Sequence, residues 1–342
     1  MISKTRVIRE LKTNNLSQRY FTCSETGYLK LFIYYHMLNQ KISGLIAAPF
    51  TPFDENGELN LELIPQYYAM LKRNRVTGAF ICGSTGEGVS LTYEEKVAVM
   101  TAWARLTKED DAFTLMMLLG GTNIKECQQL ARLAERVGVD VVSFTAPSYF
   151  KPANVDQLAK CCVEIARAAP NTAFYYYHIP VLTGGNFQMI DLLKQIDGVI
   201  PNFKGIKYTH EDFMDFLSCM NYADRKYDML WGRDENMLSA LVLGNKGAVG
   251  STYNYAAPLY LALMEAYDKG ELEKANALQQ QSIDMITLLG KYGGISVGKA
   301  YMKLIDLDCG AFRLPVKNMS AEQFELFKND VNKLNFQTFC AQ

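Results

Sequence analysis

The sequence predicts an α/β protein, a (β/α)8 TIM barrel with additional C-terminal helices. Short apolar runs alternate with helical patterns eight times between residues 42 and 270. The apolar runs are continuous, as in parallel strands that are covered by other elements on both faces. Eight such units in about 230 residues match the size of a closed barrel. An open doubly wound sheet is disfavoured, because the first run, GLIAAPFTP, lacks a GxGxxG motif.

Each predicted strand is followed by a segment with apolar residues at helical spacing. The strands are expected at residues 42–50, 78–83, 113–120, 140–146, 172–180, 203–208, 227–232 and 247–252. The helices are expected at residues 59–74, 92–107, 123–138, 154–169, 187–196, 211–223, 235–244 and 257–270. Thr92 and Glu95 form a T-x-x-E pattern, which predicts a capping box at the start of its helix.

The predicted organisation has three parts. Residues 1–36 show no clear hydrophobic period, so we expect a disordered N-terminal extension; an arm that binds a partner is the alternative. Met37 opens a stretch that resembles a natural protein start. Residues 37–270 are expected to form the catalytic barrel, and residues 271–342 a C-terminal helical extension packed on it.

Composition excludes several classes of function. The formal net charge is −1, which gives no electrostatic case for binding nucleic acid or an anionic membrane. No apolar run approaches the ~20 residues that span a bilayer. The eight cysteines include no CxxC pair, as expected for reduced thiols in the cytoplasm. The three histidines are too scattered to suggest a zinc site, although this count does not exclude carboxylate ligands.

Lys207 is the first candidate for chemistry, because it ends a short apolar strand with no acidic neighbour. Active sites of such barrels lie at the C-terminal ends of the strands. A strand-end lysine is more often a solvated surface group. In a desolvated barrel mouth, however, its pKa would fall and the neutral amine would attack a ketone to form a Schiff base. That chemistry needs neither a metal nor a bound cofactor.

Two further strand ends carry polar groups that fit this chemistry. Tyr177 shares one face of its strand with Tyr175, so its hydroxyl is a candidate proton carrier beside an imine; packing in the core is the alternative. His178 should point the other way. Ser84 and Thr85 lie in the glycine-rich stretch CGSTGEG, which is either a plain tight turn or a nest of backbone N–H groups and hydroxyls for a small carboxylate.

Asp234 and Glu235 follow the seventh strand and are expected on the rim of the barrel mouth. Ionised carboxylates accept hydrogen bonds only, which suits a ligand rich in hydroxyl groups; a loop with a helix cap is the alternative.

Taken together, the motifs GSTGE, YYHIP, GIKYT and GRDE…GSTYN resemble the N-acetylneuraminate lyases within the dihydrodipicolinate synthase-like class I aldolases. The resemblance runs from about Gly44 to the C-terminal helices. It implies a (β/α)8 barrel, usually a homotetramer, that reversibly splits sialic acid into pyruvate and N-acetylmannosamine.

The resemblance also implies roles for individual residues. Lys207 corresponds to the Schiff-base lysine, Tyr177 to the proton-shuttling tyrosine, and Ser84 and Thr85 to the carboxylate-binding pair. Tyr149 is similar to a tyrosine that joins the relay from a neighbouring subunit. The positions that would hold the sugar chain are Thr209, Gly232, Asp234, Glu235 and Ser251.

One position departs from the synthase branch, which usually has an arginine five residues after the tyrosine. Here that residue is Leu182, whose apolar side chain cannot hold a second carboxylate. The sequence therefore favours a lyase. The alternatives are another pyruvate-dependent aldolase, such as dihydrodipicolinate synthase or a 2-keto-3-deoxy sugar acid aldolase, and a non-catalytic protein that binds sialic acid or pyruvate.

Overall fold

The computed structural model describes residues 41–342, and Ile42–Gln342 form one compact unit. The predicted extension at residues 1–36 lies outside the described residues. Eight parallel strands close into a barrel, with β8 paired to β1. They are β1 (Gly44–Ala47), β2 (Gly78–Ile81), β3 (Thr114–Leu118), β4 (Val141–Thr145), β5 (Ala173–His178), β6 (Phe203–Tyr208), β7 (Asp228–Trp231) and β8 (Gly247–Gly250). The predicted (β/α)8 architecture is confirmed.

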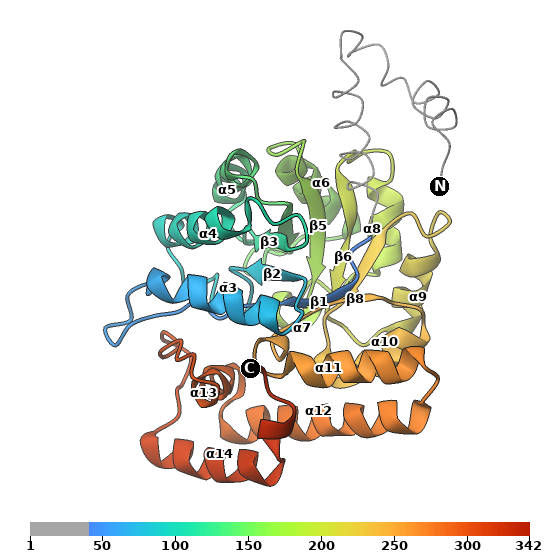
Figure 1. Cartoon of the computed structure of the whole chain (residues 1–342). Helices are drawn as coiled ribbons and strands as arrows, with labels where there is room; N and C mark the ends of the chain where they lie inside the picture. The colour runs from blue at the N-terminus through green and yellow to red at the C-terminus, as the bar shows by residue number, and fades with distance from the viewer. Residues whose placement is uncertain (1–40) are drawn as a thin grey trace. The chain divides into compact units, whose positions relative to one another are not determined.

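Helices surround the barrel, one or more after every strand (Figure 1). They are α3 (Ile64–Arg73), α4 (Tyr93–Thr107), α5 (Ile124–Val137), α6 (Val155–Ala166), α7 (Pro180–Thr183), α8 (Met189–Ile196), α9 (Phe213–Asn221), α10 (Met237–Val242) and α11 (Tyr253–Asp268). Three C-terminal helices follow, α12 (Leu272–Tyr292), α13 (Val297–Leu304) and α14 (Ala321–Lys333). Short 3-10 turns are η2 (Leu61–Leu63), η3 (Asp234–Asn236), η4 (Gly294–Ser296) and η5 (Phe336–Thr338).

Local sequence signals explain where several helices begin and end. Thr92 and Glu95 form the predicted capping box at the start of α4, each side chain bonding the other residue's backbone N–H. Asn123 and Asn154 cap α5 and α6 from one side only, their side-chain oxygens each accepting a hydrogen bond from the backbone N–H three residues later. Gly138 ends α5 in the left-handed conformation, with φ of 87°.

The core has two layers. The larger layer lies between the strands and the helices, and a smaller cluster fills the barrel interior. The interior cluster contains Tyr175 and Tyr177 but not Tyr176, as the alternation along β5 predicts. His178 contacts Tyr176 and Tyr208 on the other side of the sheet, which is also as predicted.

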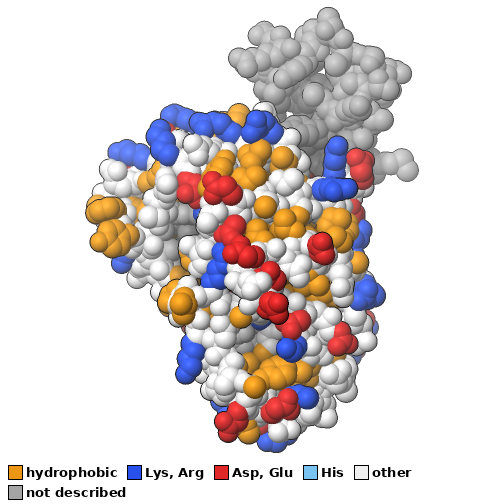
Figure 2. All heavy atoms as spheres, turned by 90° about the vertical axis from the view of Figure 1, so that its left-hand side faces the viewer, with side chains coloured by type: hydrophobic (Ala, Val, Ile, Leu, Met, Phe, Trp, Pro, Cys, Tyr) orange, Lys and Arg blue, Asp and Glu red, His pale blue; other side chains and the backbone are white. Residues whose placement is uncertain are grey.

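The surface is mixed in charge. On the face in Figure 2, acidic and basic side chains lie among uncharged areas, in keeping with the net charge of −1. Within residues 41–342, no helix is long and apolar enough to cross a membrane.

Candidate active site

Lys207 lies inside the barrel near the C-terminal end of β6, and only 4% of its surface is exposed. It pairs with Tyr177 of β5 on one side and Leu230 of β7 on the other. Its Nζ is 4.1 Å from the ring centre of Phe80 and 4.2 Å from that of Tyr177. The amine is therefore enclosed by aromatic walls rather than extended into solvent.

Burial controls the charge of this amine. Desolvation lowers the pKa of Lys207 from an ordinary 10.5 to about 7, while the negative charge of Asp234 acts in the opposite direction. The lowering corresponds to ~5 kcal/mol against the ammonium form. Attraction of a cation to aromatic faces contributes only ~0.5–2 kcal/mol in its favour. Desolvation is the larger effect, so a large fraction of Lys207 is a neutral amine near pH 7.

Tyr177 supplies a hydroxyl beside the amine. Its side chain is buried and packs edge-on against Phe80, with ring centres 5.5 Å apart. Burial raises the pKa of Tyr177, and the hydroxyls of Ser84 and Thr209 act the other way. The phenol is therefore protonated near neutral pH, and it can pass a proton between neighbouring hydroxyls.

Ser84 and Thr85 lie in the tight loop that follows β2, which we call the carboxylate loop (Gly83–Gly88). Backbone bonds close it, from the Gly88 N–H to the Gly83 carbonyl at 3.1 Å and from the Glu87 N–H to the Ser84 carbonyl at 3.2 Å. A Cβ atom at Gly88 would lie 1.9 Å from the Cys82 carbonyl oxygen, so the closure requires glycine there.

The carboxylate loop is held in a strained backbone conformation. Cys82, which directly precedes the loop, and Glu87 within it have φ of 55° and 56°, values that residues other than glycine rarely adopt. Each costs on the order of 1–3 kcal/mol and persists only where surrounding contacts enforce it. One such contact is the Thr51 hydroxyl, which donates to the Gly86 carbonyl at 2.6 Å.

Asp234 lies deeper than the rim position expected from the sequence, and only 5% of its surface is exposed. Gly250 explains this position, because a Cβ there would lie 1.9 Å from the Asp234 carboxylate. The N–H and hydroxyl of Thr252 both donate to Oδ2, at 3.0 and 2.6 Å. Among the described residues, Oδ1 has no hydrogen-bond partner. It is a buried acceptor on a carboxylate whose negative charge acts on the Lys207 amine.

Other predicted substrate contacts lie around the same strand ends. Gly232 leaves room for Thr209, whose Oγ1 would lie 1.9 Å from a Cβ added at Gly232. Glu235 is half-buried and pairs with Arg233 at 3.1 Å. Burial raises the pKa of Glu235. Ser251 follows β8 and is also half-buried.

Tyr149 does not join this group within one chain. Its side chain is 81% exposed and packs edge-on against Phe150, with ring centres 5.1 Å apart. Phe80 is the residue that the sequence argument missed, although its place within the predicted second strand could have indicated an inward-facing ring. Within residues 41–342, no cluster of His, Cys, Asp or Glu is placed to hold a metal ion.

Comparison with known proteins identifies the family. Residues 41–334 match the model of the dihydrodipicolinate synthetase family. The chain belongs to this family. An N-acetylneuraminate lyase from Rattus norvegicus is 39% identical over 304 residues, which are 88% of this chain and 95% of that protein.

Solved structures of the dihydrodipicolinate synthetase fold agree. The structure of Proteus mirabilis N-acetylneuraminate lyase superposes with a TM-score of 0.84 at 37% identity, covering 87% of this chain and all of that one. A dihydrodipicolinate synthase from Bacillus anthracis has a TM-score of 0.79 at 24% identity, covering 85% of this chain and 97% of that one. At that identity the likeness shows the fold alone.

Position 182 is where the resemblance leads us to expect an arginine in the synthase branch. Leu182 lies on α7 and is 61% exposed, next to Val181, which is also apolar and exposed. A leucine offers neither charge nor hydrogen bonds to a second substrate carboxylate.

Proposed function

We propose that this protein is an N-acetylneuraminate lyase, a class I aldolase that reversibly cleaves N-acetylneuraminate to pyruvate and N-acetyl-D-mannosamine. The observation that carries the proposal is Lys207, a buried amine with its pKa lowered to about 7 in contact with the Tyr177 ring. A protein that only binds a ligand has no need of a buried, neutral nucleophile. The similarity to relatives named N-acetylneuraminate lyase supports the choice of substrate.

In the first step, the neutral amine of Lys207 attacks the C2 ketone of the open-chain sugar. Proton transfers convert the resulting carbinolamine to a protonated imine and release one water molecule. The Tyr177 hydroxyl, near Ser84 and Thr209, is placed to move these protons.

In the second step, the C3–C4 bond breaks. The proton of the C4 hydroxyl leaves through the Tyr177 relay, the C4 oxygen becomes the aldehyde of N-acetylmannosamine, and the bonding electron pair moves through C3 to the imine nitrogen. Protonation of the resulting enamine at C3 and hydrolysis of the imine release pyruvate and restore Lys207. Because the imine is the electron sink, the proposed reaction requires no cofactor.

The remaining residues hold the substrate in this proposal. Ser84 and Thr85 bind the C1 carboxylate through hydroxyls and backbone N–H groups. The sugar hydroxyls are bound by Thr209, Asp234, Glu235 and Ser251, with Gly232 leaving room for Thr209. For Asp234, the proposed acceptor is Oδ1, which has no hydrogen-bond partner among the described residues.

We also propose that the protein acts as a cytoplasmic homotetramer, in which Tyr149 of one subunit completes the relay of its neighbour. The exposure of Tyr149 and Phe150 supports such a contact. Seven free cysteines among the described residues fit a reducing compartment.

A substrate panel tests the assignment. Pyruvate release should be fastest from N-acetylneuraminate and weak from other 2-keto-3-deoxy acids, and condensation of pyruvate with aspartate semialdehyde should stay at background. Robust synthase activity, or a strong preference for another keto acid, would assign the chain to a different branch of the family. No turnover of any of these acids would favour a binding protein.

A further inference from the structure

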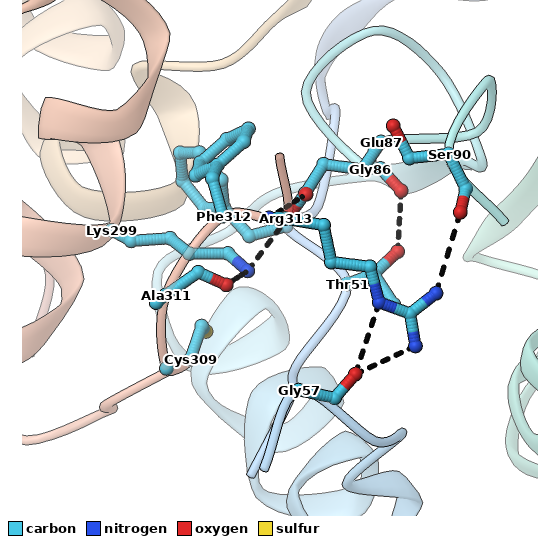
Figure 3. A network of polar contacts seen from close by, with 12 residues as sticks. Thr51, Gly57, Gly86, Glu87, Ser90, Lys299, Cys309, Ala311, Phe312 and Arg313 are labelled. Carbon is cyan, nitrogen blue, oxygen red and sulfur yellow. Dashed lines mark hydrogen bonds and ion pairs between the residues drawn. The ribbon is translucent and has the colours of Figure 1, made fainter. Parts of the chain in front are cut away.

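The carboxylate loop is contacted from outside the barrel by the C-terminal helical region, through a set of residues more than 200 positions away in sequence. Figure 3 shows Lys299 of α13 and Arg313 of the following segment reaching the loop that carries Gly86, Glu87 and Ser90. The residues that make these contacts, Glu87, Lys299 and Arg313, have no role in the reaction proposed above.

The Glu87 carboxylate is the group in the carboxylate loop to which the C-terminal helical region binds. Lys299 Nζ donates to its Oε1 at 2.9 Å, and the backbone N–H of Arg313 donates to its Oε2 at 2.8 Å. The side chains of Lys299 and Glu87 are each only 3% exposed. Lys299 also donates to the Ala311 carbonyl at 3.0 Å and lies over the rings of Phe53 and Phe312.

The Arg313 side chain holds the segment that follows the carboxylate loop. It donates to both carboxylate oxygens of Glu95, at 2.8 and 2.5 Å, and to the Ser90 carbonyl at 3.3 Å. It also donates to the Gly57 carbonyl at 3.0 and 2.6 Å. Its planar guanidinium therefore ties the segment after the carboxylate loop, the start of α4 and the loop after β1 together, while the backbone N–H of Arg313 holds Glu87 in the carboxylate loop itself.

A buried ion pair is a poor source of net stability, because both charges lose their hydration. Replacing such a pair with well-packed apolar residues of similar volume often leaves the free energy of unfolding unchanged or raises it. What such a pair does provide is a fixed position, since each charge must meet its partner. Here the fixed residue is Glu87, which has φ of 56° at the end of the tight loop that carries Ser84 and Thr85.

We propose that Lys299 and Arg313 are positioning residues for substrate binding: they hold Glu87, and through it the carboxylate loop, in the conformation that presents Ser84 and Thr85 to the substrate carboxylate. This inference rests on the proposed function. Under it, the C-terminal helical region is a part of the active-site framework and not only a cover for the barrel.

The test compares imine formation on Lys207 by two small ketones, one with a carboxylate and one without. Pyruvate and acetone are each titrated against the full-length protein, and the imine is trapped with borohydride. The double variant Glu87→Gln/Lys299→Met removes both buried charges together, while the amide oxygen can still accept from the Arg313 N–H. Lys303→Met is the matched control, because Lys303 lies on the same helix in an exposed pair with Asp308.

The double variant should need about tenfold more pyruvate for half-maximal trapping, with the acetone titration unchanged, and Lys303→Met should match the wild type for both ketones. A tenfold change corresponds to about 1.4 kcal/mol of binding free energy. A purely structural role would instead lower the melting temperature and the trappable fraction for both ketones equally. That result, or an unchanged pyruvate titration in the folded double variant, would overturn the inference.

A milder variant covers the case in which the double variant does not fold. Arg313→Met keeps the backbone N–H that binds Glu87 but removes the contacts to Ser90, Gly57 and Glu95. It should raise the half-maximal pyruvate concentration by about threefold, again without affecting acetone; no change would overturn the inference. If the wild type itself forms no pyruvate adduct on Lys207, the proposed function fails and this inference fails with it. Normal trapping by the wild type with unaffected variants refutes this inference alone.

Discussion

Replacing Lys207 by methionine should make the protein inactive but more stable. The substitution keeps an unbranched side chain of similar volume and removes an amine that is 4% exposed. An unfolded chain holds this lysine in water with a pKa of 10.5, whereas burial lowers the pKa to about 7 in the folded state. Folding therefore works against the ammonium form at neutral pH.

The size of the effect follows from the two pKa values. Below pH 7 the cost to stability is at its full ~5 kcal/mol, and it falls as the pH rises from 7 to 10.5, because the unfolded state there binds more protons than the folded state. At pH 7 the cost is ~4 kcal/mol and at pH 9.5 it is ~1.5 kcal/mol. Imperfect packing of the methionine offsets ~1 kcal/mol. Lys207→Met should thus be stabilised by ~3 kcal/mol at pH 7 and by almost nothing at pH 9.5.

Urea unfolding of the wild type and Lys207→Met at the two pH values measures this difference. Lys303→Met, which removes an exposed lysine, is the control and should show no comparable dependence on pH. If Lys207→Met is no more stable than the wild type at pH 7, or if its advantage does not shrink at pH 9.5, then Lys207 is not held in a desolvated, largely neutral state.

Three other predictions concern the chemistry. The rate of imine formation with pyruvate should rise with pH and level off above about 7, because the neutral amine of Lys207 is the nucleophile. Stopped-flow kinetics measures this rate, and a rate that still rises steeply up to pH 10 would contradict the lowered pKa. Tyr177→Phe should still form the pyruvate imine but lose ~10²–10⁴ in kcat, as expected when a proton carrier is removed; steady-state turnover near the wild-type value would exclude the relay. Glu235→Ala should raise KM for N-acetylneuraminate about tenfold or more through loss of a charged hydrogen bond, with pyruvate trapping unchanged; an equal loss of trapping would place Glu235 in the chemistry or the fold instead.

The barrel architecture could be predicted from the sequence, and the reasons are physical. Strands buried on both faces read as continuous apolar runs, so all eight could be located, and their C-terminal ends had to converge once the barrel closed. Alternation along β5 placed Tyr177 inside the barrel and His178 outside it. The pairing of Tyr177 with Lys207 follows from neighbouring strands in parallel register.

The depth of the site was harder to predict. Asp234 is buried because Gly250, sixteen residues later, leaves space for its carboxylate, and no local pattern links the two positions. The pairing of Glu87 with Lys299 spans 212 residues and likewise has no periodic signal. Such contacts depend on tertiary packing, which hydrophobic periodicity does not encode.

The most direct test of the account is to trap the covalent intermediate. The full-length protein is incubated with pyruvate and borohydride, digested, and analysed by mass spectrometry. The account predicts one stable pyruvate adduct, on the peptide that contains Lys207, and none in Lys207→Met. An adduct on another lysine, such as the half-buried Lys204 on the same strand, or turnover by Lys207→Met, would contradict it.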